Sequence, residues 1–330
     1  MSATDPVGRR SILAPPRPRP QRRLALIVIA VLSLIILLAA SDVIALVSRV
    51  ERVDLPRATL AVADAGQTWV IVGSDNRDWT VGDDSIYGRG ATRVGDHADI
   101  VIVIHQTPQG NHALVLPRDL WVTPADGQTG RLTMMMARSP ATFAEAMCLT
   151  LGIPVDHLLM VRMSTFVNVI DAIGGVAIDF PYDTRDAESN LSIGAGRQQL
   201  DGAMALAFVR SRQAEQLIDG QWVGVDKITG ASKDRPTAAA QVMSQLVTRI
   251  KSERNPLVWQ SLAWSLSGGS VIDRNSSLLD LPGLIGALDE PITVLPVSAD
   301  SGKIVDLPSD ASWAALTAAG YARAGCQIGG

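Results

Sequence analysis

Arginine and aspartate residues gather at the ends of four short apolar runs in the sequence. They are, in chain order, Asp75 and Arg77, then Asp99, then Arg118 and Asp119, and last Arg210 and Arg212. In open α/β sheets ligands bind beyond the carboxyl ends of the strands, so residues from several strand ends can converge on one crevice. We therefore take these side chains as the candidate functional residues.

The chemistry of this set is that of phosphate binding. Arginine forks match phosphate oxygens with two parallel hydrogen bonds. Carboxylates on neighbouring strand ends can hold Mg²⁺ against the same phosphates. The pattern predicts an anion site beside an acidic metal site. Each charge taken singly has the alternative of a solvated loop residue, so the prediction depends on their convergence.

The runs that carry these residues are typical of buried strands. They read WVIVG at 69–73, DIVIVIH at 99–105 and NHALVLP at 111–117, and the run at 207–209 (AFV) is short enough to be a further strand. The four residues 107–110 between the second and third runs predict a hairpin. Further strands are expected at 176–180 and 292–297.

Helices are expected between these strands. Ser139 and Pro140 open one as N-cap and first residue, and Gly152 ends it. Others are expected at 165–173, from Pro236 onward, and at 312–319. Strands that alternate with helices indicate an α/β domain, and the hairpin makes its sheet mixed rather than purely parallel.

An apolar segment precedes this domain. Residues 24–41 (LALIVIAVLSLIILLAAS) carry no charge over eighteen positions, and about 20 helical residues cross a bilayer. A cleavable signal peptide is the alternative, but its apolar region spans about 7–15 residues. We expect an uncleaved membrane anchor.

The flanking charges give the orientation. Six arginines and one acid precede the anchor, so the N-terminus is expected in the cytoplasm and the remainder outside. Of 29 bases and 33 acids in the chain, the outer part keeps 23 and 32, a charge near −9 that disfavours nucleic-acid binding. An oxidising exterior permits Cys148 and Cys326 to pair, and two buried thiols are the alternative.

Six short motifs occur in an order that resembles the LytR–CpsA–Psr family. They are Gly73-Ser74-Asp75-x-Arg77, Ala98-Asp99, Leu116-Pro117-Arg118-Asp119-Leu120-Trp121-Val122, Asp171-Ala-Ile-Gly-Gly-Val176, Leu200-Asp201-Gly202-x-x-Ala205-Leu206 and Val209-Arg210-Ser211-Arg212. Each is weak alone, and the ordered set, from about Trp69 to Leu246, is specific. A single anchor and an outward domain also fit the family.

The resemblance implies a three-layer α/β/α sandwich with a mixed central sheet, preceded by one transmembrane helix. It implies a phosphotransferase that takes a glycopolymer from a polyprenyl-pyrophosphate carrier and joins it to peptidoglycan. The polyprenyl chain would enter an apolar tunnel, and Mg²⁺ would be the cofactor. The partners implied are this lipid-linked glycopolymer, the peptidoglycan acceptor and membrane lipid.

The resemblance also implies roles for single residues. Asp75 and Asp99 would hold Mg²⁺ and, with Arg118 and Arg210, act in catalysis; they can meet only if their two strands are antiparallel. Asp119 would orient Arg118 or support the metal. The pyrophosphate-binding set would be Arg77, Arg118, Asp119, Arg131, Arg210, Arg212 and Gln241.

This chain departs from the family pattern in three places. His97 stands where an arginine is usual, and a neutral imidazole binds phosphate less firmly. Arg131-Leu132-Thr133 replaces a Lys-Ile-Asn-like triplet, keeping the base and losing the amide, and Met134 to Met136 follow as tunnel lining or plain core. Ala240 precedes Gln241 where the family often has arginine.

The organisation expected from the sequence has five parts. They are a cytoplasmic Arg/Pro-rich tail at 1–23, a transmembrane helix at 24–47, a juxtamembrane segment at 48–68, a catalytic domain at 69–250 and a C-terminal extension at 251–330 packed on the same domain.

Two other functions use the same residues or fold: a polyprenyl-pyrophosphate pyrophosphatase in which water replaces the acceptor hydroxyl, and a non-catalytic envelope regulator or scaffold.

Overall fold

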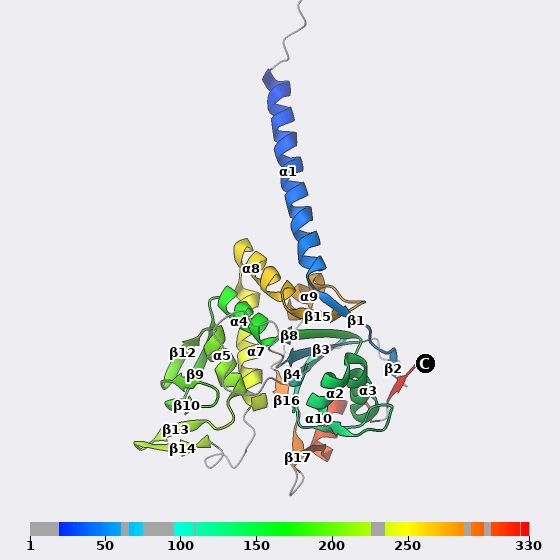
Figure 1. Ribbon diagram of the computed structural model, residues 1–330, viewed down its shortest axis with the longest axis vertical. Coiled ribbons are helices and arrows are strands. Elements are labelled where there is room, and N and C mark those ends of the chain that lie inside the picture. The colour runs from blue at the N-terminus through cyan, green and yellow to red at the C-terminus, as the bar shows by residue number, and fades with distance from the viewer. Residues whose placement is uncertain are drawn as a thin grey trace, which may run out of the picture. The chain divides into compact units, whose positions relative to one another are not determined.

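The computed structural model describes residues 20–60, 66–74, 96–108, 110–225, 235–286, 292–299, 305–323 and 325–329 of the chain (Figure 1). Its contacts separate Met1–Ala45 from Leu46–Gly330. The first part holds most of helix α1 (Pro20–Ser48). Within α1 the 25 residues from Leu24 to Ser48 are long and apolar enough to cross a membrane, as the sequence predicts.

A seven-stranded mixed sheet lies at the centre of the second part. Its strand order is β1 (Glu51–Val53), β15 (Ser270–Asp273), β8 (His157–Arg162), β3 (Gln67–Ser74), β4 (Ala98–Thr107), β5 (Gly110–Leu116) and β16 (Thr293–Val294). Strands β3, β4 and β5 form an antiparallel meander, and β8 is parallel to β3. The predicted hairpin at 107–110 and the mixed character of the sheet are therefore confirmed.

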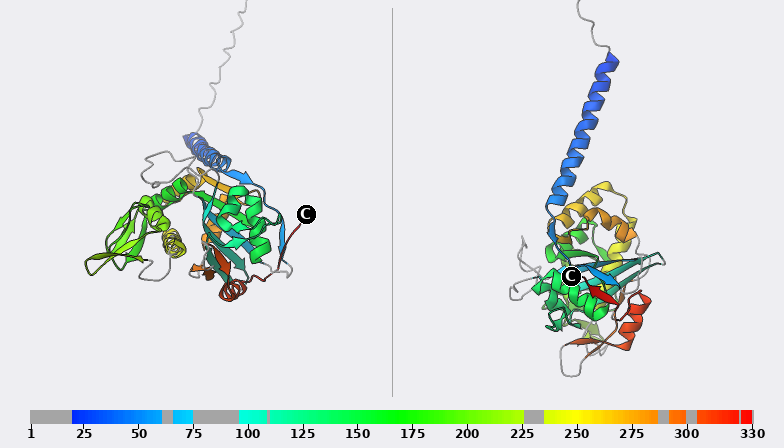
Figure 2. Two further views of the ribbon diagram at one scale, coloured as in Figure 1. Left: turned by 60° about the horizontal axis from the view of Figure 1, so that its bottom comes forward. Right: turned by 90° about the vertical axis from the view of Figure 1, so that its right-hand side faces the viewer.

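Helices cover both faces of this sheet. Alternate side chains of β3 point to opposite faces, so that Val70 and Val72 join one core cluster and Trp69 another. The first cluster includes residues of α2 (Leu132–Arg138), α3 (Pro140–Leu151) and α10 (Asp310–Ala318); the second includes residues of α7 (Arg235–Ser252) and α9 (Leu281–Gly286). The result is the three-layer α/β/α arrangement (Figure 2).

Helix α3 begins and ends where the sequence predicts. The Ser139 hydroxyl accepts a hydrogen bond from the backbone N–H of Thr142, and Pro140 is the first helical residue. Gly152 ends the helix with φ of 70°, in the left-handed region. Phe143, Met147 and Leu151 point from one helix face into the core against the sheet.

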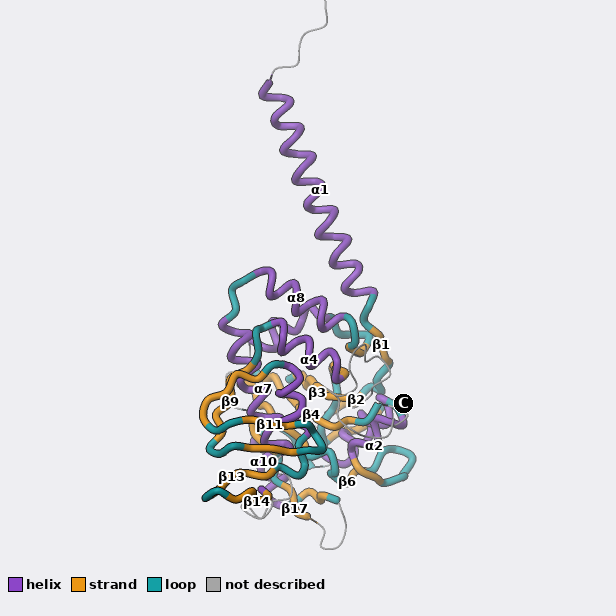
Figure 3. Tube along the Cα trace, turned by 60° about the vertical axis from the view of Figure 1, so that its left-hand side comes forward, coloured by secondary structure: helices purple, strands orange, loops and turns teal. Residues whose placement is uncertain are grey.

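A third cluster of apolar residues forms beside the sheet. It lies within a group of elements made up of α4 (Met163–Ala172), β9 (Val176–Phe180), β10 (Thr184–Asp186), β11 (Leu191–Ile193), β12 (Gly196–Leu200), α5 (Gly202–Arg210), β13 (Glu215–Ile218), β14 (Gln221–Gly224) and α8 (Pro256–Ser267). Figure 3 shows the strands of this group together on one side of the domain. Apolar residues of α4, β9, α5, α7 and α8 pack together in its core.

One strand expected from the sequence is wrong. Residues 207–209 lie in helix α5, which Asp201 caps by accepting a hydrogen bond from the N–H of Met204. Ala205, Leu206 and Val209 are buried with helical spacing, and the three-residue run did not distinguish a helix from a strand. Arg210 therefore ends a helix rather than a strand.

Short elements at several places along the chain complete the fold. They are β2 (Ala58–Leu60), β6 (Trp121–Val122), β7 (Gly130–Arg131), a 3₁₀ turn η2 (Leu278–Asp280), β17 (Val297–Ala299), β18 (Asp306–Pro308) and β19 (Cys326–Ile328). The strand expected at 292–297 is divided into β16 and the start of β17, with Pro296 between them. Residues 251–330 thus contribute β15 and β16 to the same central sheet.

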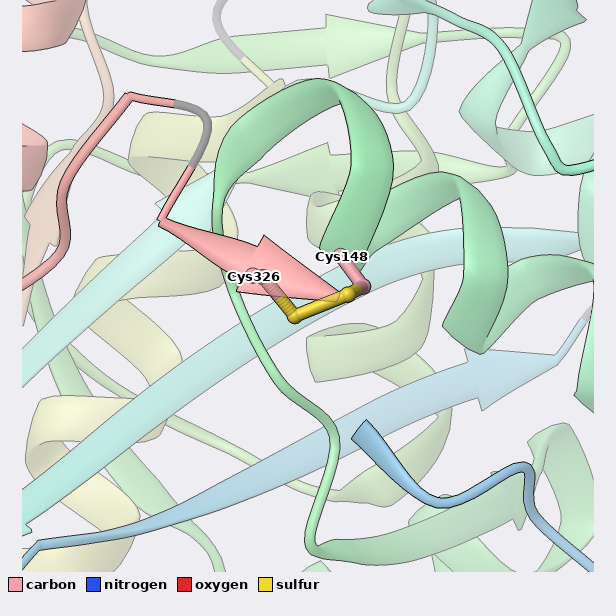
Figure 4. The surroundings of a disulfide bond; sticks show 2 residues. All are labelled: Cys148 and Cys326. Atoms are coloured by element: carbon pink, nitrogen blue, oxygen red, sulfur yellow. A yellow bond between two sulfur atoms is a disulfide. The ribbon is translucent and has the colours of Figure 1, made fainter. Parts of the chain in front are cut away.

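A disulfide fastens the C-terminal segment to the core (Figure 4). Cys148 of α3 and Cys326 of β19 are 178 positions apart in the sequence, and their Cα atoms lie 5.2 Å apart. Strand β19 pairs with β2, where Cys326 is opposite Leu60. Pairing, rather than two buried thiols, is the arrangement of these cysteines.

Candidate active site

The predicted functional residues of the meander lie at one edge of the central sheet. Because β3 and β4 are antiparallel, Ser74 at the end of β3 is opposite Ala98 at the start of β4. Because β4 and β5 are also antiparallel, the end of β5 reaches the same edge, with Leu116 opposite Val101. Asp99 and the segment after Leu116 are thus brought together.

A chain of ion pairs connects four charged side chains at this edge. Arg118 donates a hydrogen bond to Asp99, and these two side chains are 13% and 15% exposed. Asp119 lies between two arginines: its Oδ2 is 3.8 Å from Nε of Arg118, and its Oδ1 is 3.6 Å from Nη1 of Arg131. Two carboxylates and two guanidinium groups therefore alternate in a partly buried cluster.

The backbone around Arg118 is fixed by the start of α2. The carbonyl of Arg118 accepts a hydrogen bond from the N–H of Thr133 at 3.0 Å, and the carbonyl of Leu120 accepts one from Leu132 at 2.8 Å. Strand β7 pairs with β6, which puts Arg131 opposite Trp121. These contacts hold the segment of Arg118 and Asp119 against the segment that carries Arg131.

Two of the departures from the family pattern lie at or beside this cluster. His97, which immediately precedes β4, is buried. Thr133 is also buried, and its hydroxyl has no hydrogen-bond partner among the described residues. The substitution of threonine for the family's asparagine therefore leaves a small polar group beneath the turn that carries Arg118.

Arg210 and Arg212 come from a different element. Arg210 is the last residue of α5, and Arg212 is two residues beyond it and exposed. The ion pairs of Arg118 do not extend to them in the described part of the chain. A weaker link exists, because Ile100, next to Asp99, packs against the cluster that contains Val209.

Asp186 holds the segment that carries these arginines. Its Oδ2 accepts hydrogen bonds from the Ser211 hydroxyl and from the backbone N–H groups of Arg212 and Gln213, at 2.7, 2.8 and 3.0 Å. Burial raises the pKa of the Asp186 carboxyl, but these bonds and one from the N–H of Glu188 outweigh it, so the pKa lies below its ordinary value. No local pattern singled out Asp186 for this role, because it is one of several charged residues in the stretch DTRDAE at 183–188.

The other motif residues shape the junction between α4 and α5. The carboxylate of Asp171 accepts a hydrogen bond from the N–H of Gly202 at 2.7 Å. A Cβ on Gly202 would lie 2.3 Å from the carbonyl oxygen of Val167, so only glycine allows the two helices to approach this closely. Gly175 has φ of 88° and turns the chain into β9. These motifs position α5 and hence Arg210.

The remaining predicted residues that the structure describes lie on helices. Gln241 is exposed on α7, and Ala240 is buried against the sheet, so that the departure at 240 fills a core position. Met135 and Met136 belong to the core cluster beneath α2, and Met134 is exposed. Asp75 and Arg77 lie outside the described residues.

The described residues supply carboxylate oxygens but no complete metal centre of their own. No group of three His, Cys, Asp or Glu side chains suited to a metal ion occurs among them. Mg²⁺ is commonly held by one or two carboxylates together with substrate phosphates, so Asp99 with one further acid would suffice.

Comparison with known proteins gives consistent matches. A sequence model of the LytR_cpsA_psr family matches residues 44–256. The chain is 32% identical over 168 residues to "Probable cell wall biosynthesis protein LcpB" of Corynebacterium glutamicum, covering 50% of this chain and 41% of that protein. It is 28% identical over 157 residues to "Polyisoprenyl-teichoic acid--peptidoglycan teichoic acid transferase TagV" of Bacillus subtilis, covering 44% and 40%. The chain thus matches less than half the length of these two relatives.

A solved structure matches over more of the chain. The "LytR-Csp2A-Psr enzyme from Actinomyces oris" superposes with a TM-score of 0.71 and 30% identity, covering 85% of this chain and 99% of that one. The structure "TagT bound to LI-WTA" superposes with a TM-score of 0.52 at 18% identity, which shows the fold alone. The family match spans more than half of the residues, and the fold agrees with it: the chain belongs to the LytR–CpsA–Psr family.

Proposed function

We propose that this chain is a membrane-anchored phosphotransferase that moves a glycopolymer from a polyprenyl-pyrophosphate carrier to peptidoglycan outside the cell. The observation that carries the proposal is the cluster of Arg118, Arg131, Asp99 and Asp119 at one sheet edge. Family relatives named as teichoic acid transferases support the same reaction class.

The arginines would bind the pyrophosphate. Arg118 presents a planar fork whose orientation is fixed by Asp99 on one side and Asp119 on the other. Arg131 adds a second guanidinium beside Asp119, and Arg77, Arg210 and Arg212 would complete the set. Arginine suits this role because it stays protonated and matches phosphate oxygens bidentately.

The reaction is a displacement at phosphorus. The acceptor hydroxyl attacks the phosphorus that carries the glycan, the bridging P–O bond breaks, and polyprenyl monophosphate leaves. The hydroxyl proton passes to a carboxylate, for which Asp99 and Asp75 are the candidates. Positioning and charge stabilisation supply most of the rate enhancement in such transfers, and the fixed arginines provide both.

Asp75 and Asp99 would hold Mg²⁺, which when bound neutralises charge on the phosphate oxygens. Without a cation, two neighbouring carboxylates would repel each other. The pairing of Asp99 with Arg118 offsets part of that repulsion. The carboxylates would therefore serve both the metal and the arginine.

The outward orientation is part of the proposal. Six arginines precede the apolar segment that begins at Leu24, which favours a cytoplasmic N-terminus. The Cys148–Cys326 disulfide supports an oxidising compartment for the domain. In intact protoplasts external protease should cleave the domain and leave the N-terminal tail; protection of the domain with loss of the tail would reverse the topology.

The test of function is transfer by the full-length chain in lipid vesicles. The substrate is a polyprenyl-pyrophosphate-linked oligosaccharide, offered with and without peptidoglycan fragments. A glycan–peptidoglycan phosphodiester is the expected product, whereas release of a glycan phosphate without acceptor would favour the pyrophosphatase. A scaffold would yield neither product.

The matched variants are Arg118→Ala and Arg138→Ala. Arg138 also forms an ion pair, with Asp126, but its pair lies on the exposed side of α2. We expect Arg118→Ala to weaken carrier binding by about 10- to 150-fold, the equivalent of about 1.5–3 kcal/mol of charge-assisted hydrogen bonding. Arg138→Ala should bind as the parent does.

A further inference from the structure

Helix α8 has an exposed face that carries no charge. Its twelve residues, PLVWQSLAWSLS, include no Asp, Glu, Lys or Arg. Leu257 is 75% exposed and Trp264 36% exposed. With Gln260 and Ser261 between them they form one face of the helix, at spacings of three, four and seven residues. A helix face turned to water normally carries charged side chains, so this face is unusual for a solvated surface.

The opposite face explains why α8 is a helix and what it packs on. Asn255 caps it by accepting a hydrogen bond from the N–H of Leu257, and Pro256 is its first residue. Leu262 is buried, and Val258, Trp259 and Leu266 pack with it against the cluster that contains α4 and α5 residues. Packing in the core therefore explains the inner face of α8, and it does not explain why Leu257 and Trp264 lie exposed on the outer face.

The outer face is connected to the chain just after the candidate membrane helix. Arg49 directly follows α1, and its guanidinium carbon lies 4.9 Å from the centre of the Trp264 ring. Gly268, one turn further along, leaves room for the same guanidinium: a Cβ there would lie 2.8 Å from Nη2 of Arg49. Trp264 therefore contacts the side chain of Arg49, the first residue after α1.

A second exposed leucine lies beside α8. Leu279, in the 3₁₀ turn η2, is 71% exposed, and η2 contacts α8. Exposed apolar side chains that gather on one surface mark a site of interaction rather than a solvated face. We use the name "α8 face" for three exposed apolar side chains, Leu257 and Trp264 of α8 together with Leu279 of the neighbouring turn η2.

We propose that the α8 face lies in the interface of the lipid bilayer next to the anchor, so that the domain rests on the membrane surface. This inference depends on the membrane anchoring of the proposed function. The bilayer is the occupant because Arg49 ties the face to the exit of α1. Trp at headgroup level, with Arg49 reaching the phosphates, is the arrangement found at membrane interfaces.

The consequence concerns access of the lipid carrier. Helix α8 packs on α4, and α4 begins directly after Arg162 of β8. Arg162 is opposite Ser74, at the same sheet edge as Asp99 and Arg118. A domain resting on the α8 face would hold this edge one helix away from the membrane surface, where a polyprenyl carrier emerges from the bilayer.

The test measures depth in the bilayer at single positions. Both native cysteines are paired, so a third cysteine gives one site for a fluorescent label. The variants are Leu257→Cys and Leu279→Cys, with Met134→Cys, 47% exposed on α2, as the matched control and Ile35→Cys to report insertion of α1. Each full-length labelled chain is placed in phosphatidylcholine–phosphatidylglycerol vesicles that contain a lipid with a nitroxide on its headgroup.

We expect the labels at 257 and 279 to be quenched at least about threefold more than the label at 134, because interfacial side chains lie at headgroup level. Near-UV circular dichroism identical to the parent shows that the fold is retained at these exposed positions. Equal quenching at 257, 279 and 134, with position 35 shielded from an aqueous quencher, would overturn the proposal. The measurement needs no turnover, so an inactive chain with quenched labels contradicts the proposed function and leaves this inference standing.

Discussion

The guanidinium group of Arg118 donates a hydrogen bond to the carboxylate of Asp99, although the two residues are 19 positions apart in the sequence. The pairing exists because β4 and β5 are antiparallel neighbours, which brings the start of one strand and the end of the other to the same edge. Because both side chains are mostly buried, the attraction between them is screened less than in a surface pair. The pair therefore holds an arginine fork in place before any phosphate binds.

This geometry predicts a difference between arginine and lysine at position 118. Arg118→Lys keeps the positive charge but loses the planar fork that can contact Asp99, Asp119 and phosphate together. We expect about tenfold weaker binding of a polyprenyl pyrophosphate, close to 1.4 kcal/mol. Fluorescence titration of the full-length chain in detergent measures it.

Arg138→Lys is the control, since its partner Asp126 is an exposed acid outside the ion pairs of Asp99, Arg118, Asp119 and Arg131. An unchanged affinity in Arg118→Lys, together with a loss in Arg118→Ala, would mean that charge alone matters at this position.

The parts of this site that depend on neighbouring residues in the sequence could be predicted, and the parts that depend on distant residues could not. Short-range patterns predict the two strands next to Asp99 and Arg118 and the hairpin between those strands. The hairpin in turn brings Asp99 and Arg118 to one edge of the sheet. The helix that ends at Arg210 was missed because three apolar residues fit either periodicity. Asp186 was missed because its five donors come partly from residues more than 20 positions away, a relationship that no local pattern records.

Asp186 gives a prediction about stability and pH. The pKa of its carboxyl lies below the ordinary value, because hydrogen bonds from residues 188 and 211–213 outweigh its burial. Asp186→Asn should lower the free energy of unfolding by about 1.5–3 kcal/mol at neutral pH, as expected for hydrogen bonds to a charged group. It should also weaken carrier binding, since Arg212 loses its backbone anchor.

The sign of the pH dependence follows from the lowered pKa. The folded state binds the proton less tightly than the unfolded state, so the stabilisation is complete above the unfolded pKa of about 4 and is lost as the pH falls through the folded value. The difference between parent and Asp186→Asn should therefore close below about pH 4. Urea denaturation from pH 3 to pH 7 measures it, with Asp183→Asn as the control, because the Asp183 carboxylate also accepts a hydrogen bond from a backbone N–H, that of Ala195. A difference that stays constant with pH would show that the charge of Asp186 is not the cause.

The disulfide predicts a redox-dependent stability. Cys148 and Cys326 close a loop of 178 residues, and removal of such a link typically costs about 2–5 kcal/mol. The double variant Cys148→Ser, Cys326→Ser should unfold at lower urea than the parent. A reductant should shift the parent to the same midpoint and leave the double variant unchanged. Coincident curves for oxidised parent and double variant would mean that β19 stays in place without the link.

The variant Asp99→Asn distinguishes a role of Asp99 in binding the metal from a role in positioning Arg118. If Asp99 holds Mg²⁺, Asp99→Asn abolishes transfer at every Mg²⁺ concentration, because an amide is a weaker ligand for a hard cation than a carboxylate. Carrier affinity should then change little, because the amide oxygen introduced by Asp99→Asn can still accept the hydrogen bond from Arg118. If Asp99 only orients Arg118, the same retained hydrogen bond should keep turnover close to that of the parent at every Mg²⁺ concentration. Turnover and carrier affinity across a Mg²⁺ titration, with Asp75→Asn measured in parallel and Asp126→Asn as the control, distinguish the two. Full Mg²⁺-dependent turnover in either Asp75→Asn or Asp99→Asn would show that the two carboxylates do not share the ion.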